Sequence, residues 1–389
     1  MTSKVVLAAI RYPPAPGGAE THVAALAEGL AKRGHDVVVH TSDLFTEYPF
    51  ERRSSLPDKV NGIPVVRHRA VRVGGAWTTM PSMGKALRAA ANEADIIHAH
   101  SYGYYQTVVA SREAKRAGKP FVFTPHFHPP WSMEGGAWRR ALRSLYDPWL
   151  GQRVVDAASR VIAVSSGELE EMRVHLRVPN AVVIPNGFHA AHYASVPDGA
   201  PFRARFGLGD SPVVLFAGRL ASNKGLITLL DAFARLRGDA RLVLAGQDQG
   251  WRARLEEQAR GLGIRERVTF TGHLDDGAYR SALSAADVLA LPSEWEAFGI
   301  VLAEAMACGT PCVGTRVGGA PDVIVDEETG FLVPYGDAVA LAKAFERILC
   351  DDALAARMGH AGRARAMQSY SWDAVVERTI ALYAEVGRR

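Results

Sequence analysis

Two carboxylates stand eight positions apart in an apolar stretch of the chain, Glu296 and Glu304 in EWEAFGIVLAE (294–304). A carboxylate among apolar side chains is costly unless a cation or a hydrogen-bond donor pairs with it. The preceding run DVLALPS is typical of a buried strand that ends in Pro-Ser, and GIVLAEAMACG predicts a helix beginning near Gly299. Glu296 is therefore expected in the loop before the helix, and Glu304 inside it.

The backbone between these glutamates predicts a ligand site. The amides of Phe298, Gly299 and Ile300 would form an exposed helix N-terminus, whose free N–H groups and partial positive charge favour a phosphate or a polar sugar. Carboxylates accept hydrogen bonds from vicinal hydroxyls. One carboxylate before the helix and another within it suit a ligand with a phosphate centre and hydroxyls on both sides.

Two cations follow another expected strand, PVVLFAG, in the segment AGRLASNKGLITLL. Arg219 and Lys224 flank a short loop that opens a helix, and two cations plus helix-start amides can neutralise a diphosphate. The simpler alternative is a pair of solvated loop cations. Their place at the carboxyl end of a strand, where ligands of parallel sheets bind, favours the diphosphate interpretation.

A glycine pair follows the first expected strand, in RYPPAPGGAETHVAALAEGL. Gly17 and Gly18 let the backbone pass close to a ligand at the start of a helix. The spacing is not that of the GxGxxG dinucleotide fingerprint. Taken alone, the segment is more simply a helix start with a tight turn.

Short apolar runs that alternate with helical patterns position these residues. The runs are KVVLAAI, DVVVHT, DIIHAH, PFVFTPH and RVIAVSS in the first half, and PVVLFAG, ARLVLAG, RVTFTG, DVLALPS and TPCVGT in the second. Uninterrupted apolar strands between helices indicate parallel sheets covered on both faces. The Pro- and Gly-containing stretch near 190–205 breaks the pattern. We expect two doubly wound Rossmann-like domains, 1–195 and 205–370, facing a central cleft.

The C-terminal segment SYSWDAVVERTIALYAEVGRR predicts an amphipathic helix, about 373–389, with Ser371 as its N-cap and a place packed back on the first domain.

Composition is that of an ordinary soluble globular protein, with 389 residues, 48% hydrophobic and 22% charged. The formal charge of +4 and the absence of a long Lys/Arg block do not indicate a nucleic-acid partner. The three cysteines suggest a reducing compartment, and Cys308 and Cys312 are expected to be small buried residues. No uncharged run is long enough to span a bilayer, so we expect a cytoplasmic protein.

The chain resembles retaining GT-B glycosyltransferases of family 4, which use nucleotide-sugar donors. The resemblance covers nearly the whole length through a set of segments: PGGAETHVAALAEGLAKRGHDV, IHAH, VIPNG, AGRLASNKG, EAFGIVLAE, EAMACGTPCVGTRVGGAPDVI and TGFLVPYGD. The combination is highly specific, although no single segment is.

The resemblance implies a role for each matching residue. Gly17 and Gly18 would approach the donor, and Arg219 and Lys224 would bind the diphosphate. Glu296 and the amides of Phe298, Gly299 and Ile300 would hold the donor sugar and phosphate, and Glu304 the ribose. His126 in TPHFH would lie against the transferred sugar, Asn186 in VIPNG would join the donor site, and His273 and Leu274 in TGHL would lie near the base.

The resemblance also implies transfer to an acceptor hydroxyl with retained anomeric configuration, by front-face attack. Glu296 is expected to hold the sugar rather than to act as a nucleophile. Because the chain contains no D-x-D sequence and supplies two cations, we expect no required metal and no other cofactor.

Other functions fit the sequence less well. His98 with His100, and His126 with His128, form His-x-His pairs that could bind a hydrolytic metal, but no carboxylate cluster accompanies them. AVSSGE lacks the G-x-S-x-G elbow of a serine hydrolase, so its serines more simply end a strand and cap a helix. A nicotinamide oxidoreductase would need the missing glycine spacing. A nucleotide-sugar epimerase on the same fold and a non-catalytic nucleotide-sugar-binding protein stay open.

The acceptor is left open as a glycan, a lipid-linked sugar or a small molecule, as are the donor base and the oligomeric state. The segment 137–153 carries Trp138, Arg139, Arg140, Arg143, Trp149 and Arg153. Such a basic, Trp-bearing helix can lie on an anionic membrane surface, at the inner face of the membrane. We prefer the alternative, a solvated helix whose tryptophans pack inward.

Overall fold

The computed structural model describes residues 2–47, 49–74, 77–132 and 137–388. The chain divides into two compact units: unit 1, residues 1–187 with 372–389, and unit 2, residues 188–371. The division falls before Phe188, so residues 188–195, which we had placed in the first domain, belong to unit 2. Phe188 is buried there, its ring 5.3 Å from that of Tyr193 and its amide bonded to the carbonyl of Tyr370.

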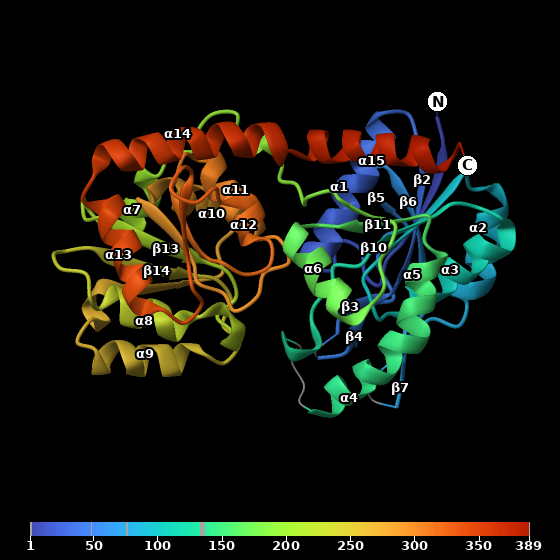
Figure 1. Cartoon of the computed structure of the whole chain (residues 1–389), viewed down its shortest axis with the longest axis horizontal. Helices are drawn as coiled ribbons and strands as arrows, with labels where there is room; N and C mark the ends of the chain where they lie inside the picture. Colours follow the sequence, from blue (N-terminus) through green and yellow to red (C-terminus); the bar gives the residue numbers. More distant parts are fainter. Residues whose placement is uncertain (1, 48, 75–76, 133–136, 389) are drawn as a thin grey trace. The chain divides into compact units, whose positions relative to one another are not determined.

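Unit 1 is built on an eight-stranded sheet of order β12-β11-β10-β9-β1-β2-β6-β5, parallel except that β5 pairs antiparallel with β6 (Figure 1). Its strands are β1 (Lys4–Ala8), β2 (Asp36–Ser42), β5 (Lys59–Val60), β6 (Ile63–His68), β9 (Ile96–His100), β10 (Phe121–Thr124), β11 (Arg160–Ala163) and β12 (Ala181–Val183). Strand order reverses between β1 and β9, so the loops after these two strands diverge and leave room for a ligand.

The helices of unit 1 are α1 (Gly18–Lys32), α2 (Met83–Glu93), α3 (Tyr105–Ala117), α4 (Ala137–Tyr146), α5 (Gln152–Ala157), α6 (Ser166–His175) and α15 (Trp372–Val386), and those packed on the sheet cover both of its faces. Two buried apolar clusters lie in the unit, and one of them includes Trp372, Val375 and Val376 of α15. Helix α15 packs on α1 so closely that a Cβ at Gly29 would lie 2.4 Å from Val376.

Two short hairpins that we did not expect are β3 (Leu44–Thr46) with β4 (Glu51–Arg52), and β7 (Val71–Val73) with β8 (Trp77–Thr79).

Unit 2 contains a six-stranded, all-parallel sheet of order β15-β14-β13-β16-β17-β18. The strands are β13 (Val213–Ala217), β14 (Arg241–Ala245), β15 (Val268–Gly272), β16 (Val288–Leu291), β17 (Cys312–Thr315) and β18 (Gly330–Val333). In chain order this is the 3-2-1-4-5-6 arrangement of a Rossmann fold, with the reversal between β13 and β16. The expected pair of doubly wound parallel sheets is confirmed.

The helices of unit 2 are α7 (Ala200–Phe206), α8 (Leu226–Phe233), α9 (Arg252–Gly261), α10 (Asp276–Ala285), α11 (Ile300–Ala307), α12 (Ala320–Val323), α13 (Ala338–Leu349) and α14 (Asp352–Ser369). Helix α11 begins directly after Gly299, as predicted.

Cys308 and Cys312 are buried free thiols, as expected for small core residues. Within the described ranges, no helix has the length and apolar character needed to cross a bilayer.

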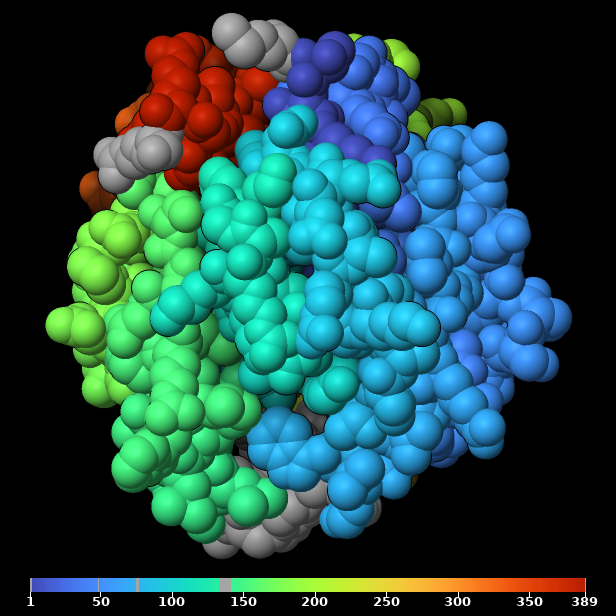
Figure 2. Space-filling model, turned by 90° about the vertical axis from the view of Figure 1, so that its right-hand side faces the viewer, coloured from blue at the N-terminus to red at the C-terminus, as the bar shows by residue number. Residues whose placement is uncertain are grey.

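Two expectations for the segment 137–153 are wrong. Arg143 is not a surface cation, because its side chain is buried 2.5 Å from Asp147 and its guanidinium lies over the ring of Tyr102. Trp149 does not pack inward, since it is 67% exposed. The side chains of Trp138, Arg139 and Arg140 fall outside the described residues. Figure 2 shows the green part of the chain that contains this segment at the surface of unit 1.

Candidate active site

An ammonium–carboxylate pair lies at the reversal point of the unit 2 sheet. Lys224 ends the short 3-10 helix (Ser222–Lys224) that follows β13, and Glu296 lies in the loop after β16. The two strands are neighbours, so their carboxyl ends bring residues 72 positions apart together. Nζ of Lys224 lies 2.5 Å from Oε1 of Glu296, and Ser293 donates its hydroxyl to the same oxygen at 2.8 Å.

Two glycines allow the backbone around this pair to pack tightly. A Cβ at Gly225, directly after Lys224, would lie 2.0 Å from the carbonyl oxygen of Pro292. A Cβ at Gly318 would lie 1.9 Å from the carbonyl oxygen of Glu296. Both glycines have positive φ, 63° and 50°, a conformation that other residues adopt only with strain. The loops that carry the ammonium and the carboxylate are therefore held against neighbouring backbone.

A pocket of about 320 Å³ lies at the carboxyl ends of β13, β14 and β15. Arg219, His273 and Leu274, which the sequence placed near a diphosphate and a base, all line it. The Arg219 guanidinium donates to Oε1 of Gln249 at 2.8 Å, so a neutral amide holds it and its charge stays available to an anion. The remaining lining residues are Ala217, Gly218, Ala245, Gly246, Gln247, Asp276 and Tyr279.

The start of helix α11 is formed as predicted. Gly299 is its N-cap with φ of 84°, and Ile300 is the first helical residue. The amides of a first helical turn have no acceptor within their own helix, so they can bind an anion or a hydroxyl. Phe298 contributes its backbone only, because its side chain is buried against the ring of Tyr370.

Glu304 lies one and a half turns inside α11, and two tyrosines satisfy its carboxylate. Tyr279 donates to Oε2 at 2.6 Å and Tyr193 to Oε1 at 3.2 Å. Burial raises the pKa of Glu304 above its usual value, while the two hydroxyls oppose that shift. Neither partner could be predicted from the sequence, since one tyrosine is 111 positions away and the other lies on α10.

In unit 1, the glycine pair opens α1. Gly17 is the N-cap with φ of 149°, and Gly18 is the first helical residue with open space beside it. A Cβ at Gly17 would lie 2.0 Å from Oε2 of Glu20, which is buried and forms an ion pair with Arg11 at 2.7 Å. A carboxylate directly beneath the glycine makes this helix start better suited to hydroxyl groups than to a phosphate alone.

A second set of predicted residues meets at the reversal point of the unit 1 sheet. His126 follows β10 with the unusual φ of 44°, and its Nε2 is buried without a hydrogen-bond partner. The side-chain oxygen of Asn186 accepts a hydrogen bond of 2.7 Å from Nδ1 of His22, a residue on α1 that we did not single out. The ring centroids of His22 and His126 are 4.8 Å apart, and His100, the last residue of β9, lies beside both.

Burial lowers the pKa of all these imidazoles, to about 4 for His22 and well below the usual value for His100 and His126. The rings are therefore neutral at pH 7. His98 has a structural role instead, because its two nitrogens lie 2.7 Å from the hydroxyl of Tyr383 and 2.8 Å from that of Thr124.

The loop that carries His126 is fixed by a buried carboxylate that sequence reasoning missed. Glu168 of α6 accepts hydrogen bonds from the backbone amides of Phe127 and Val164, and so ties together the loops after β10 and β11. Ser165 caps α6 by accepting from the amide of Glu168 at 2.9 Å, as the strand-end serines predicted. Burial raises the pKa of Glu168 to about 7.

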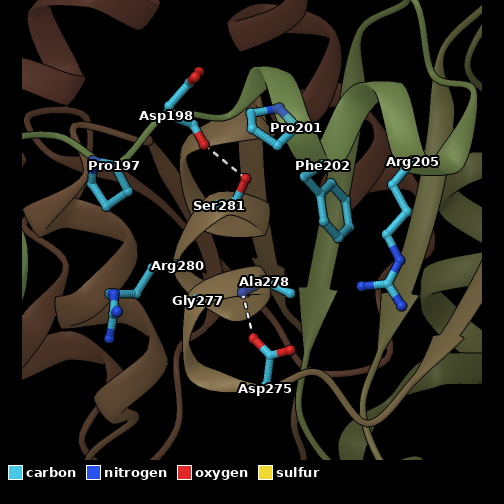
Figure 3. Close-up of a pocket in the computed structure, with 10 residues that line it drawn as sticks. All are labelled: Pro197, Asp198, Pro201, Phe202, Arg205, Asp275, Gly277, Ala278, Arg280 and Ser281. Carbon is cyan, nitrogen blue, oxygen red and sulfur yellow. Dashed lines mark hydrogen bonds between the residues drawn. The ribbon is translucent and has the colours of Figure 1, made fainter.

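A larger pocket, of about 460 Å³, lies between α7 and α10 of unit 2 (Figure 3). Two of its polar side chains are already engaged within it: Ser281 donates to the carbonyl of Asp198 at 2.7 Å, and Asp275 accepts from the amide of Ala278 at 2.9 Å. None of the residues that the sequence placed in the donor site lines it. The strand-end pocket and the Lys224–Glu296 pair therefore define the candidate active site.

Two doubly wound parallel sheets with polar residues gathered at both reversal points are the architecture of a GT-B glycosyltransferase. Residues 16–192 match the family described as Glycosyltransferase Family 4, and residues 201–365 match Glycosyl transferases group 1. The chain belongs to the family-4 type of GT-B glycosyltransferases, as the resemblance predicted.

Individual relatives match over nearly the full length. The chain is 33% identical to alpha-maltose-1-phosphate synthase of Mycobacterium tuberculosis, covering 98% of this chain and 99% of that protein. It is 31% identical to D-inositol 3-phosphate glycosyltransferase of Xylanimonas cellulosilytica, covering 96% and 93%. A crystal structure of Anabaena Alr3699/HepE in complex with UDP and glucose matches with a TM-score of 0.77 at 25% identity, covering 98% and 100%. These relatives do not favour the epimerase or non-catalytic alternatives.

Proposed function

We propose that this glycosyltransferase moves a sugar from a nucleoside-diphosphate sugar to an acceptor hydroxyl, with retention of configuration and without a divalent metal. The observation that carries the proposal is the Lys224–Glu296 pair at the reversal point of the unit 2 sheet, next to the start of α11. A cation, a hydroxyl-binding carboxylate and free helix-start amides at one place match the parts of a sugar diphosphate.

The donor assignment rests on the strand-end pocket. Arg219 lines it together with His273 and Leu274, which gives a cation for a diphosphate beside surface suited to a base. Anabaena Alr3699/HepE, of the same fold and 25% identical, binds UDP and glucose according to the description of its structure. A uridine or other nucleoside diphosphate is therefore the ligand class that we assign to this pocket.

The proposed step breaks the bond between the anomeric carbon and the diphosphate oxygen and forms a bond from that carbon to the acceptor oxygen on the same face. The acceptor's proton passes to the leaving phosphate. Negative charge grows on the diphosphate as the bond breaks, and Lys224, Arg219 and the α11 amides stabilise it. Glu296 orients the sugar through its hydroxyls and does not form a covalent intermediate.

Metal independence follows from the same charges. Transferases that hold the diphosphate through a divalent ion commonly present an Asp-x-Asp motif, and this chain contains none. Two side-chain cations and a helix N-terminus supply the positive charge that the ion would bring.

We also propose that unit 1 contacts an anionic membrane surface through the segment 137–153. Leu145 and Trp149 are 66% and 67% exposed, and Leu142 and Leu150 are also exposed. Apolar side chains at this exposure on a helical segment can insert into the boundary between headgroups and acyl chains. A lipid-linked acceptor would be reached from that position.

Thermal unfolding with UDP, GDP, ADP or TDP, each in excess EDTA or in Mg²⁺, tests the donor proposal. A ligand that binds only the folded state stabilises it by about 2.7 kcal/mol at a hundredfold excess over its dissociation constant. We expect one nucleotide to raise the melting temperature equally in EDTA and in Mg²⁺. A shift that appears only with Mg²⁺ would overturn metal independence, and no shift with any nucleotide would overturn the donor assignment.

A further inference from the structure

We propose that His22, His100 and His126 of unit 1 form a binding site for a single divalent transition-metal ion of the zinc type. The ligand nitrogens of these residues all lie within 4.8 Å of one another. Neither the sequence pattern nor the relatives assign a metal here, and the proposed glycosyl transfer does not use one.

The spacing of the rings suits such an ion. Their centroids are 4.8, 5.5 and 5.8 Å apart, and a tetrahedral zinc with Zn–N bonds of about 2.0–2.1 Å places imidazole centroids about 5 Å apart. The same bonds need about 3.4 Å between ligand nitrogens. Rotation of the rings about their side-chain bonds would bring the nitrogens closer without a large shift of the backbone.

The hydrogen-bond pattern leaves the required lone pairs free. Among the described residues, neither buried nitrogen of His100 has a hydrogen-bond partner, and the buried Nε2 of His126 has none either. His100 is fully buried, and a buried polar atom with no partner costs about 1–3 kcal/mol unless a ligand satisfies it. An ion bound by one nitrogen of His100 and by Nε2 of His126 would remove that cost for these two atoms.

Asn186 orients the third ligand. Its side-chain oxygen lies 2.7 Å from Nδ1 of His22, and an amide oxygen can only accept. Nδ1 therefore carries the hydrogen and Nε2 keeps its lone pair, which is the arrangement in which metal-binding histidines are held by a neighbouring acceptor.

The ligand set differs from the two His-x-His pairs that the sequence suggested. His98 is excluded because hydroxyls of Tyr383 and Thr124 lie within hydrogen-bond distance of its two nitrogens. Three neutral imidazoles without a carboxylate favour Zn²⁺, Co²⁺ or Ni²⁺ over Mg²⁺ or Ca²⁺.

Metal binding is expected to inhibit transfer rather than to support it. This consequence rests on the proposed function and on the role that the family resemblance implies for His126, which would lie against the transferred sugar. The binding measurement itself does not depend on activity, so failure of the metal site and failure of the proposed function can be told apart.

The test is a titration of the untagged, EDTA-treated protein with Co²⁺, followed by visible absorption, and with Zn²⁺ in competition with a chromophoric chelator. We expect one ion per chain, and an affinity lowered by about tenfold or more in His22→Gln and in His100→Gln. The double variant His189→Gln/His192→Gln is the control: these exposed histidines of unit 2 have ring centroids 5.3 Å apart and should leave binding unchanged.

The proposal is overturned if the wild-type protein binds no ion at micromolar Zn²⁺, or if both single variants bind as tightly as wild type. Should the variants fail to fold, X-ray absorption of the zinc-loaded wild-type protein decides. Three imidazole ligands support the site, and two or fewer overturn it. Inhibition of glycosyl transfer by equimolar Zn²⁺, reversed by EDTA, would support the expected effect of metal binding on activity.

Discussion

The ammonium of Lys224 and the carboxylate of Glu296 are 2.5 Å apart, and their side chains are only 14% and 17% exposed. The pair is therefore formed before any ligand binds, and partial burial protects it from screening by salt. Ser293 shares the same carboxylate oxygen, so in the function that we propose the second oxygen of Glu296 would face the sugar hydroxyl. Lys224 keeps two further N–H donors for a phosphate.

Removal of either member of this pair is expected to abolish most of the activity. Lys224→Ala and Glu296→Ala should each lower kcat/KM for transfer by two orders of magnitude or more, because each removes charge or positioning at the reacting centre. Initial rates with the donor identified by thermal unfolding measure the effect. Lys343→Ala, an exposed lysine on α13, is the matched control. Near-normal turnover in either active-site variant, with the control unaffected, would contradict the assignment.

Gly318 should be intolerant of a side chain for a reason that Gly336 lacks. Both have positive φ, 50° and 79°, so alanine strains either backbone by about 1–2 kcal/mol. Only at Gly318 would the new Cβ meet the carbonyl oxygen of Glu296, at 1.9 Å, while Gly336 faces open space. Urea unfolding should show Gly318→Ala to be the less stable variant, and initial rates should show it to be much less active. Equal losses in the two variants would argue against the contact.

Glu168 should make stability fall as pH rises. Its folded-state pKa of about 7 lies above the ordinary value of 4.5, so the folded protein binds more protons at this site than the unfolded chain between those pH values. The stabilisation is present below pH 4.5 and is lost as pH rises through 7, by up to about 3 kcal/mol. Glu168→Gln should remove this dependence, as urea midpoints at pH 5 and pH 7.5 would show. If wild type and Glu168→Gln show the same change in urea midpoint between pH 5 and pH 7.5, the expectation is contradicted.

The buried histidine pair His40 and His68 should act in the opposite direction. Burial lowers the pKa of His40 to about 4, and Nδ1 of His40 lies 3.2 Å from Nε2 of His68. The neutral folded form is therefore stabilising above pH 6.5, and that contribution is lost as pH falls from 6.5 through 4. In urea unfolding, His40→Gln should reduce the loss of stability between pH 6.5 and pH 4. His360→Gln, at an exposed position, should leave that loss unchanged. If wild type and His40→Gln lose stability equally as the pH falls, the buried histidine pair is not the cause.

Membrane contact is expected to depend on the exposed apolar side chains of the segment 137–153. The double variant Leu145→Ser/Trp149→Ser should lower binding to anionic vesicles several-fold, because it removes the groups that would enter the interface. Val174→Ser is the control, since Val174 is 74% exposed on α6 of the same unit. Co-sedimentation with vesicles at low and high salt measures both effects. Wild-type protein that shows no salt-sensitive binding would end this proposal.

The sequence predicted much of the fold because its signals are local. Runs such as PVVLFAG and DVLALPS became β13 and β16 within a residue or two at their starts, since apolar runs and their Gly or Pro boundaries act within a few positions. The start of α11 after Gly299 followed from the same kind of signal. Strands β5, β6, β12 and β18 and the two hairpins were missed, and all of these except β6 have only two to four residues each.

The candidate site was predictable only in part. The residue types after β13, β16 and β10 were visible, because strand ends can be recognised and residues there face a ligand. The hydrogen-bond partners of these residues could not be predicted. Neither the tyrosines that donate to Glu304 nor Glu168, which holds the loop that carries His126, produces a local sequence pattern. The burial of Arg143 and the exposure of Trp149 were also misjudged, because a helix of mixed residues does not reveal which side faces the core.

By itself, the sequence determined where most of the strands and helices form, where α11 begins, and that Cys308 and Cys312 are small residues of the core. Only the tertiary structure decided that Lys224 pairs with Glu296 and that three histidines from separate elements meet at one point. The physical reason is range. Propensity, capping and periodicity act over a few residues, whereas hydrogen bonds, ion pairs and burial depend on strand order and helix packing, which bring distant residues together.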